Sequence, residues 1–71
     1  MDIKFNIVFN DFEKRINTQY LYSIEQAIDH YDWVIGNWAR IEGIRYISIY
    51  VDNKPTTYGD LKIMDLLGIK L

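Results

Sequence analysis

Apolar residues recur at helical spacing between Ser23 and Arg40, and this stretch is the strongest folding signal in the chain. The stripe consists of Ile24, Ala27, Ile28, Tyr31, Val34, Ile35 and Trp38. It predicts an amphipathic helix with one face turned toward a core. Ser23, followed by Gln26 three residues later, marks the start of the helix. Gly36 is compatible with an end, but Trp38 keeps the apolar spacing, so we expect the helix to continue to about Arg40.

Three other segments alternate with a period of two and predict β-strands over residues 3–9, 16–22 and 44–51. Polar and charged residues at 10–15 separate the first two segments and predict a turn. The connection is short, so the economical topology for these two strands is an antiparallel hairpin. The third strand follows the long helix after Gly43, which we expect to release the chain from the helix.

The chain after residue 51 predicts a turn and then a second, shorter helix. The turn-forming residues are Asp52, Asn53, Lys54 and Pro55. Thr57, with Asp60 three residues later, is typical of a helix start, and we expect a helix over residues 58–67. The apolar face expected for this helix consists of Leu61, Ile63, Met64, Leu66 and Leu67. Ile69 and Leu71 would then add a brief strand or cover the core.

The expected fold is a single α+β domain over residues 1–71, of order β-β-α-β-α. A small, mostly antiparallel sheet of three strands, or four with the C-terminal residues, carries the long helix on one face. The strand-strand-helix-strand order, with the run Thr57-Tyr58-Gly59-Asp60-Leu61 after it, resembles the β-grasp arrangement of ubiquitin-like domains. This resemblance implies a fold of that type and no particular function.

Composition limits the classes of function that the chain can serve. It has 71 residues, no Cys and one His, so we expect neither a disulfide nor a metal or cofactor site. The net charge is −2 and the eight basic residues are scattered, which argues against nucleic-acid binding by phosphate neutralisation and against a membrane surface. No apolar segment has the length of a secretory signal or a membrane span, so we expect a cytoplasmic protein.

Catalytic arrangements are weakly supported. His30 is flanked by Asp29 and Asp32, but side chains at these positions fan around a helix, whereas catalytic and metal sites need convergent groups. The glycines are too dispersed to form a phosphate-binding loop. We therefore interpret His30 as part of a solvated polar surface and expect no enzymatic activity.

The aromatic residues are more informative about function. Trp33 lies off the apolar stripe of the long helix, beside Asp29, His30 and Asn37, where packing in the core does not explain so large an apolar surface. Tyr, Trp and Arg dominate the energetic hot spots of protein interfaces. The candidate partner-binding residues are Trp33, Asp29, His30, Asn37, Arg40, Tyr46 and Tyr50.

The strand alternation also predicts which residues share the outer face of the sheet. If Ile47, Ile49 and Val51 face the helix, Tyr46 and Tyr50 stand on the opposite side. We expect this outer face to include residues from the first two strands as well. These are Lys4, Asn6, Val8, Asn17, Gln19 and Leu21.

These features favour a small, non-enzymatic protein-binding module. We expect an inhibitor or adaptor that blocks a surface of a larger intracellular enzyme. In style, the chain resembles the accessory, anti-defence proteins of phages and other mobile elements of A+T-rich bacteria. One alternative is a homodimeric structural or regulatory protein, in which pairing buries the spare aromatic residues. Another is single-stranded nucleic-acid binding through aromatic residues on the sheet, against which the negative charge counts.

Overall fold

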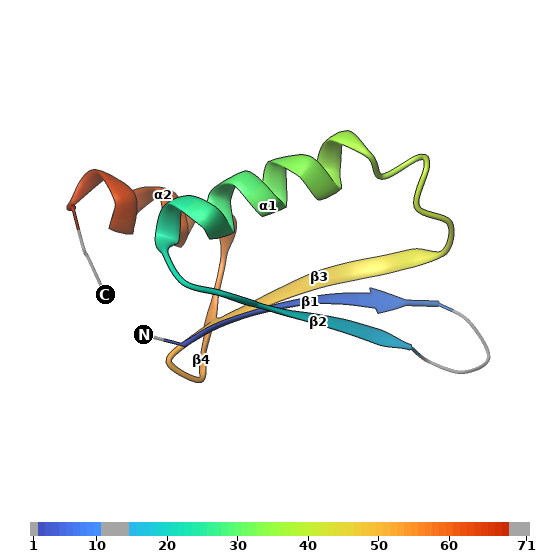
Figure 1. Ribbon diagram of the computed structural model, residues 1–71, viewed down its shortest axis with the longest axis horizontal. Helices are drawn as coiled ribbons and strands as arrows, with labels where there is room; N and C mark the ends of the chain where they lie inside the picture. The colour runs from blue at the N-terminus through green and yellow to red at the C-terminus, as the bar shows by residue number, and fades with distance from the viewer. Residues whose placement is uncertain (1, 11–14, 69–71) are drawn as a thin grey trace.

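Helices α1 and α2 cover one face of a four-stranded sheet in the computed structural model, which describes residues 2–10 and 15–68 (Figure 1). The elements are β1 (Ile3–Phe9), β2 (Ile16–Leu21), α1 (Ile24–Gly36), β3 (Ile44–Val51), β4 (Lys54–Thr56) and α2 (Tyr58–Leu66). The strands lie in the order β2-β1-β3-β4, and each neighbouring pair is antiparallel. The predicted α+β class and the first hairpin are confirmed. The strand considered at Ile69 and Leu71 lies outside the described residues, as does most of the predicted turn at residues 10–15.

The fourth strand forms where the sequence predicted only a turn. Asp52 and Asn53 have positive φ angles of 50° and 66°, which is typical of the two-residue turn that links tightly paired strands. Lys54 therefore pairs with Val51, and Pro55 pairs with Tyr50. Proline is tolerated in β4 because this strand lies at the edge of the sheet, where an outward-facing position needs no amide donor.

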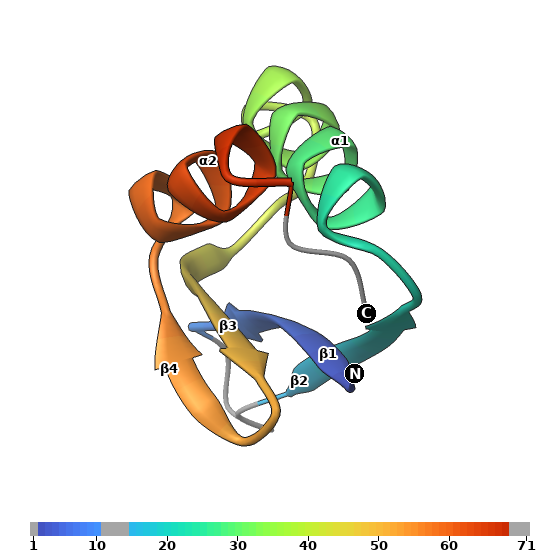
Figure 2. The ribbon, with the colours of Figure 1, turned by 90° about the vertical axis from the view of Figure 1, so that its left-hand side faces the viewer.

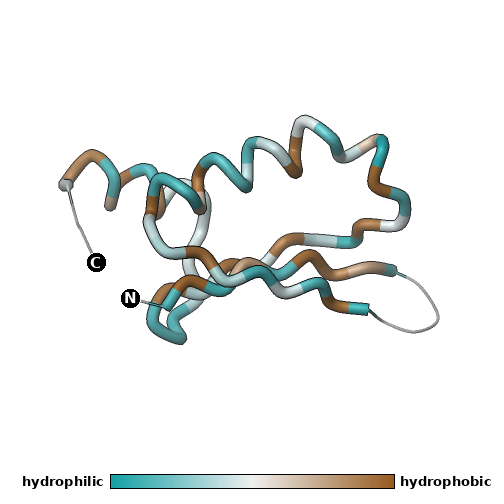
Figure 3. The backbone as a smooth tube through the Cα atoms, in the orientation of Figure 1, coloured by the Kyte–Doolittle hydropathy of each residue, from teal (hydrophilic) through white to brown (hydrophobic). Residues whose placement is uncertain are grey.

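The core lies between β1, β3 and the two helices. Hydrophobic and hydrophilic residues alternate along the first five residues of β1 (Figure 3), and its inward side chains Ile3 and Phe5 are fully buried. The buried apolar cluster consists of Ile3, Phe5, Ile7, Ile24, Ala27, Ile28, Val34, Ile49, Val51 and Leu61. The predicted strand over residues 3–9 and the predicted helical stripe both supply this core.

Helix α1 begins where the sequence indicated. The Ser23 hydroxyl accepts a hydrogen bond from the Gln26 backbone N–H at 3.1 Å. The Gln26 side-chain oxygen in turn accepts from the backbone N–H of Tyr22 at 2.9 Å. The first bond satisfies an amide donor that the first helical turn leaves without a partner, and the second ties the residue before the N-cap to the helix.

The prediction that α1 continues to about Arg40 is wrong, because the helix ends at Gly36. The Asn37 side chain donates a hydrogen bond to the Trp33 carbonyl at 2.7 Å. The Asn37 carbonyl then accepts from the backbone N–H groups of Arg40 and Ile41, at 2.9 and 3.1 Å. Short polar side chains compete in this way with the helical hydrogen-bond pattern, and the chain turns toward β3.

Helix α2 begins with the predicted capping box. Thr57 and Asp60 exchange hydrogen bonds between side chain and backbone, each 3.1 Å long. Only Leu61 of its expected apolar face is buried and Met64 is partly buried, so the predicted burial of the other three residues is wrong. The reason is positional, because the end of α2 projects beyond the sheet (Figure 1). The exposed apolar residues of this helix are Ile63, Leu66 and Leu67.

The two helices are joined on one flank of α1 only. The rings of Tyr31 and Tyr58 stack with centroids 4.3 Å apart, and the Tyr58 hydroxyl donates to Asp32 at 2.8 Å. Figure 2 shows the result, with α2 above the β4 side of the sheet and α1 toward the β2 side. The flank of α1 that faces β2 is therefore not covered by α2.

The prediction for the faces of β2 is wrong and has to be reversed. Asn17 lies opposite Ile7, Gln19 opposite Phe5 and Leu21 opposite Ile3, and directly opposed residues of antiparallel strands share a face. These three residues of β2 therefore point to the helix side. The outer face of β2 carries Ile16, Thr18 and Tyr20 instead. The burial of β1 sets this register, because a slip of one residue would turn the core side chains of β1 to solvent.

Replacing Leu61 by Ala should lower the free energy of unfolding by about 2–5 kcal/mol, since it removes a fully buried side chain from the core. Leu66 provides a matched control in the same helix, because it is 86% exposed. Leu66→Ala should change stability by no more than about 0.5 kcal/mol. Urea unfolding followed by circular dichroism measures both, and equal effects would contradict the assigned orientation of α2.

Candidate partner-binding site

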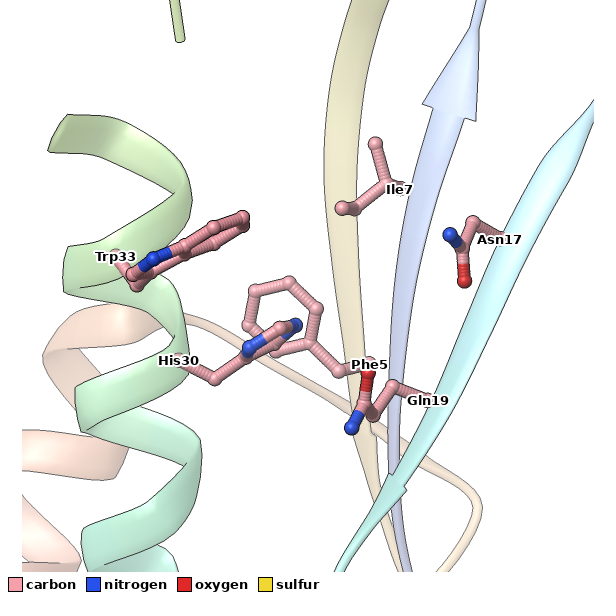
Figure 4. Close-up of a pocket in the computed structure, with 6 residues that line it drawn as sticks. All are labelled: Phe5, Ile7, Asn17, Gln19, His30 and Trp33. Carbon is pink, nitrogen blue, oxygen red and sulfur yellow. The ribbon is translucent and has the colours of Figure 1, made fainter. Parts of the chain in front are cut away.

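A cleft of about 450 Å³ opens between α1 and β2 on the helix side of the sheet. Its lining residues are Phe5, Ile7, Asn17, Gln19, His30 and Trp33 (Figure 4). Strand β1 contributes the apolar floor, β2 contributes two amide side chains, and α1 contributes two aromatic rings. The cleft exists because α2 docks on the opposite flank of α1 while β2 forms the edge of the sheet. We refer to it below as the α1–β2 cleft.

Trp33 forms the outer wall of the cleft and is 57% exposed. Its ring stacks on His30 with an angle of 5° between the planes and centroids 6.1 Å apart. His30 in turn contacts the buried ring of Phe5 edge-on, at 4.5 Å and 74°. An indole supported in this way presents a large apolar surface to solvent with little conformational freedom left to lose on binding. The sequence left open whether the C-terminal helix covers Trp33, and the structure shows that this residue is exposed.

His30 is the titratable group inside the cleft. Burial between the rings of Phe5 and Trp33 lowers the pKa of its imidazole below the ordinary value of 6.5, because partial removal from water disfavours the charged form. The ring is therefore neutral at pH 7. A neutral imidazole offers one hydrogen-bond donor and one acceptor.

The opposite wall of the cleft is polar but uncharged. Asn17 and Gln19 project from the inner face of β2 and are both exposed. Each primary amide can donate and accept hydrogen bonds. Together with the aromatic wall, they form a cleft that suits an uncharged or mixed surface of a protein, with polar groups to orient what enters.

The candidate residues that the sequence predicted do not all lie on one surface of the structure. Trp33 and His30 meet in the cleft, whereas Tyr46 and Tyr50 lie on the opposite face of the sheet, as predicted. The remaining three residues lie on or just after α1. Asp29 is exposed one helical turn before the indole, Asn37 caps the helix, and Arg40 is exposed in the following turn.

Sequence reasoning missed the floor of the cleft and its polar wall. Phe5 and Ile7 were predicted only as part of the strand over residues 3–9, and Asn17 and Gln19 were placed on the wrong face. The signal that identifies all four is the pairing register of the first hairpin. That register depends on contacts between strands and cannot be read from either strand alone.

Comparison of the chain with models of protein families, with curated proteins and with solved structures found no match. The resemblance to the β-grasp arrangement therefore remains one of element order. Within residues 2–10 and 15–68, no helix has the length and apolar character needed to cross a membrane. In the same part of the chain, no group of three or more His, Asp or Glu side chains could hold a metal ion.

Titration of His30 tests the geometry of the cleft. Because its pKa is lowered in the folded state, the unfolded chain binds more protons between the folded pKa and 6.5. The contribution of His30 to stability is therefore present above pH 6.5 and is lost as the pH falls through that window. NMR titration should give a pKa below 6.5 in the wild type and a value closer to 6.5 in Trp33→Ala, which exposes the imidazole. An unchanged pKa in the variant would contradict the stacked arrangement.

Proposed function

We propose that this protein is a small, non-enzymatic binding module that recognises another protein through the α1–β2 cleft and blocks the surface it occupies. One observation carries the proposal. Trp33 is exposed at the mouth of a cleft, yet its ring is supported from below by His30 and Phe5. Exposed aromatic residues beside a pocket are the usual anchors of protein interfaces.

The charges around the cleft favour a protein over a nucleic acid as the partner. Helix α1 carries no Lys or Arg, and its acidic residues Glu25 and Asp29 are exposed, while Asp32 is bonded to Tyr58 on the flank away from the cleft. An acidic helix beside the binding surface repels phosphate groups, whose neutralisation dominates nucleic-acid affinity. The same acidic residues suit a basic or mixed protein surface, where they increase the association rate and select the partner.

The mechanism that we propose is steric. A protruding apolar side chain of the partner enters the cleft, where Trp33 contacts it from one side and the Asn17 and Gln19 amides bind neighbouring polar groups. Bound in this way, the module covers the partner's surface and prevents access to it. An inhibitor or adaptor of a larger intracellular enzyme is the role that fits this mechanism best.

Truncation of the indole tests the anchor. Trp33→Ala should weaken binding to the partner about 30-fold or more, corresponding to a loss of about 2 kcal/mol. The partner is isolated from an extract of the source cells on immobilised wild-type protein and identified by mass spectrometry. Its Kd is then measured by calorimetry, and its enzymatic activity is assayed with and without the module.

Tyr22→Ala is the matched control, because Tyr22 is 83% exposed and does not line the cleft. This variant should bind and inhibit like the wild type. Thermal unfolding of both variants verifies that they remain folded. Equal binding by wild type and Trp33→Ala would contradict the proposal.

A homodimer is a second candidate, favoured by the outer face of the sheet. Ile16, Val8 and Tyr46 form one row across three strands, and the first and last of these side chains are exposed. We nevertheless expect sedimentation equilibrium to show a monomer over a wide concentration range. A dimer that Tyr46→Lys dissociates would establish this second candidate.

A further inference from the structure

The two edges of the sheet differ in how well they are protected from pairing with another strand. At one edge, β4 is short and contains both Lys54 and Pro55. Natural proteins use these devices to prevent pairing between edges. At the other edge, β2 (Ile16–Leu21) contains no charged residue, no Pro and no Gly. Among residues 2–10 and 15–68, no other strand pairs with its outer side, so we refer to β2 as the open edge of the sheet.

The hydrogen-bond pattern shows which backbone groups of β2 face outward. The Phe9 N–H of β1 donates to the Arg15 carbonyl at 3.0 Å, so Phe9 and Arg15 form a hydrogen-bonded pair of the ladder. In an antiparallel ladder such pairs recur at every second residue, which assigns the inward-facing backbone groups to Asn17, Gln19 and Leu21 through the register. The outward-facing N–H and C=O groups belong to Ile16, Thr18 and Tyr20.

The open edge borders the α1–β2 cleft. A strand added beside β2 would place every second side chain on the helix side of the sheet. On that side, Asn17 and Gln19 would lie between the added side chains and the core, and Trp33 would lie on the far side of the cleft from them. An added strand would therefore place a side chain at the mouth of the cleft, on the side opposite the indole.

We propose that β2 is a docking edge for an extended, basic segment of the partner protein, which joins the sheet as an added strand and places an apolar side chain at the mouth of the cleft, opposite Trp33. This proposal rests on the proposed function and specifies the partner's binding segment. Main-chain hydrogen bonds to the outward groups of β2 would supply affinity, and the cleft would supply specificity.

The basic character of the segment follows from charge complementarity. On α1, Asp29 is exposed one helical turn before Trp33, and the helix carries no Lys or Arg. Asp32 lies on the other flank of α1, where it accepts from the Tyr58 hydroxyl. Strand β2 contributes no charge of its own, and Arg15 before it lies over the Phe9 ring, 4.6 Å from its centroid. A Lys or Arg next to the apolar side chain of the segment would therefore be attracted by the carboxylate of Asp29 on α1.

The test uses peptides selected from a displayed library of random nine-residue sequences on the wild-type protein. Thr18→Pro removes an outward N–H from β2, a change that an edge strand tolerates. Thr18→Val is the matched control, because both variants lose the hydrogen bond from Thr18 to Asn6 of 2.7 Å but only the valine keeps the backbone N–H.

The expected result is a set of selected peptides with Lys or Arg next to an apolar residue. Their affinity should fall at least tenfold in Thr18→Pro and less than threefold in Thr18→Val. Replacing the basic residues of the best peptide by Glu should also weaken binding at least tenfold. Amide hydrogen exchange at Ile16, Thr18 and Tyr20 of the wild type should slow when the peptide is bound.

Three outcomes would overturn the inference. They are failure to select any peptide, equal binding by Thr18→Pro and Thr18→Val, and a wild-type homodimer that Thr18→Pro dissociates, since a second copy would then occupy the edge. The proposed function and this inference can fail independently. If Trp33→Ala binds the partner like the wild type, the proposed function itself is wrong. If Trp33→Ala abolishes capture of the partner while Thr18→Pro does not, the cleft is the binding site but the partner does not add a strand.

Discussion

The burial of the β1 side chains beneath α1 is the interaction on which the rest of the structure depends. Phe5 is fully buried in the core, and its ring also contacts His30, which supports Trp33. The same packing therefore holds the fold together and keeps the exposed indole in place. Because β1 also lies between β2 and β3, its buried face sets the register of both neighbouring strands.

The two flanks of α1 differ in what covers them. Tyr58 joins α2 to α1 through Tyr31 and Asp32 on the flank above β3 and β4. The small domain has no third helix among its described residues, so the other flank of α1 stands above the inner face of β2 without a cover. Polar residues at Asn17 and Gln19 make this arrangement stable in water, because solvation of their amides does not have to be given up. A cleft and an open strand edge thus follow from the placement of one short helix.

Much of the local structure was predictable from the sequence. The period of two in β1 and β3 was recognised correctly, because alternate residues on a strand lie on opposite faces. The start of α1 at Ser23 and the capping box of Thr57 and Asp60 were also predictable, since their hydrogen bonds join residues three or four positions apart. The position of Trp33 outside the apolar stripe was recognised as well, and the structure then showed that its side chain is exposed.

What the sequence alone determined is therefore the set of elements whose signals are local, together with the aromatic residue that no core position explains. The end of α1 at Gly36 and the strand Lys54–Thr56 also depend on local contacts, but their signals were misread. Only the tertiary structure decided which face of β2 meets the helix and that β2 lies at an edge of the sheet. The physical reason is that strand register and edge position depend on pairing between residues far apart in the chain. The α1–β2 cleft combines three such elements, so its floor and polar wall became visible only once the strands were paired.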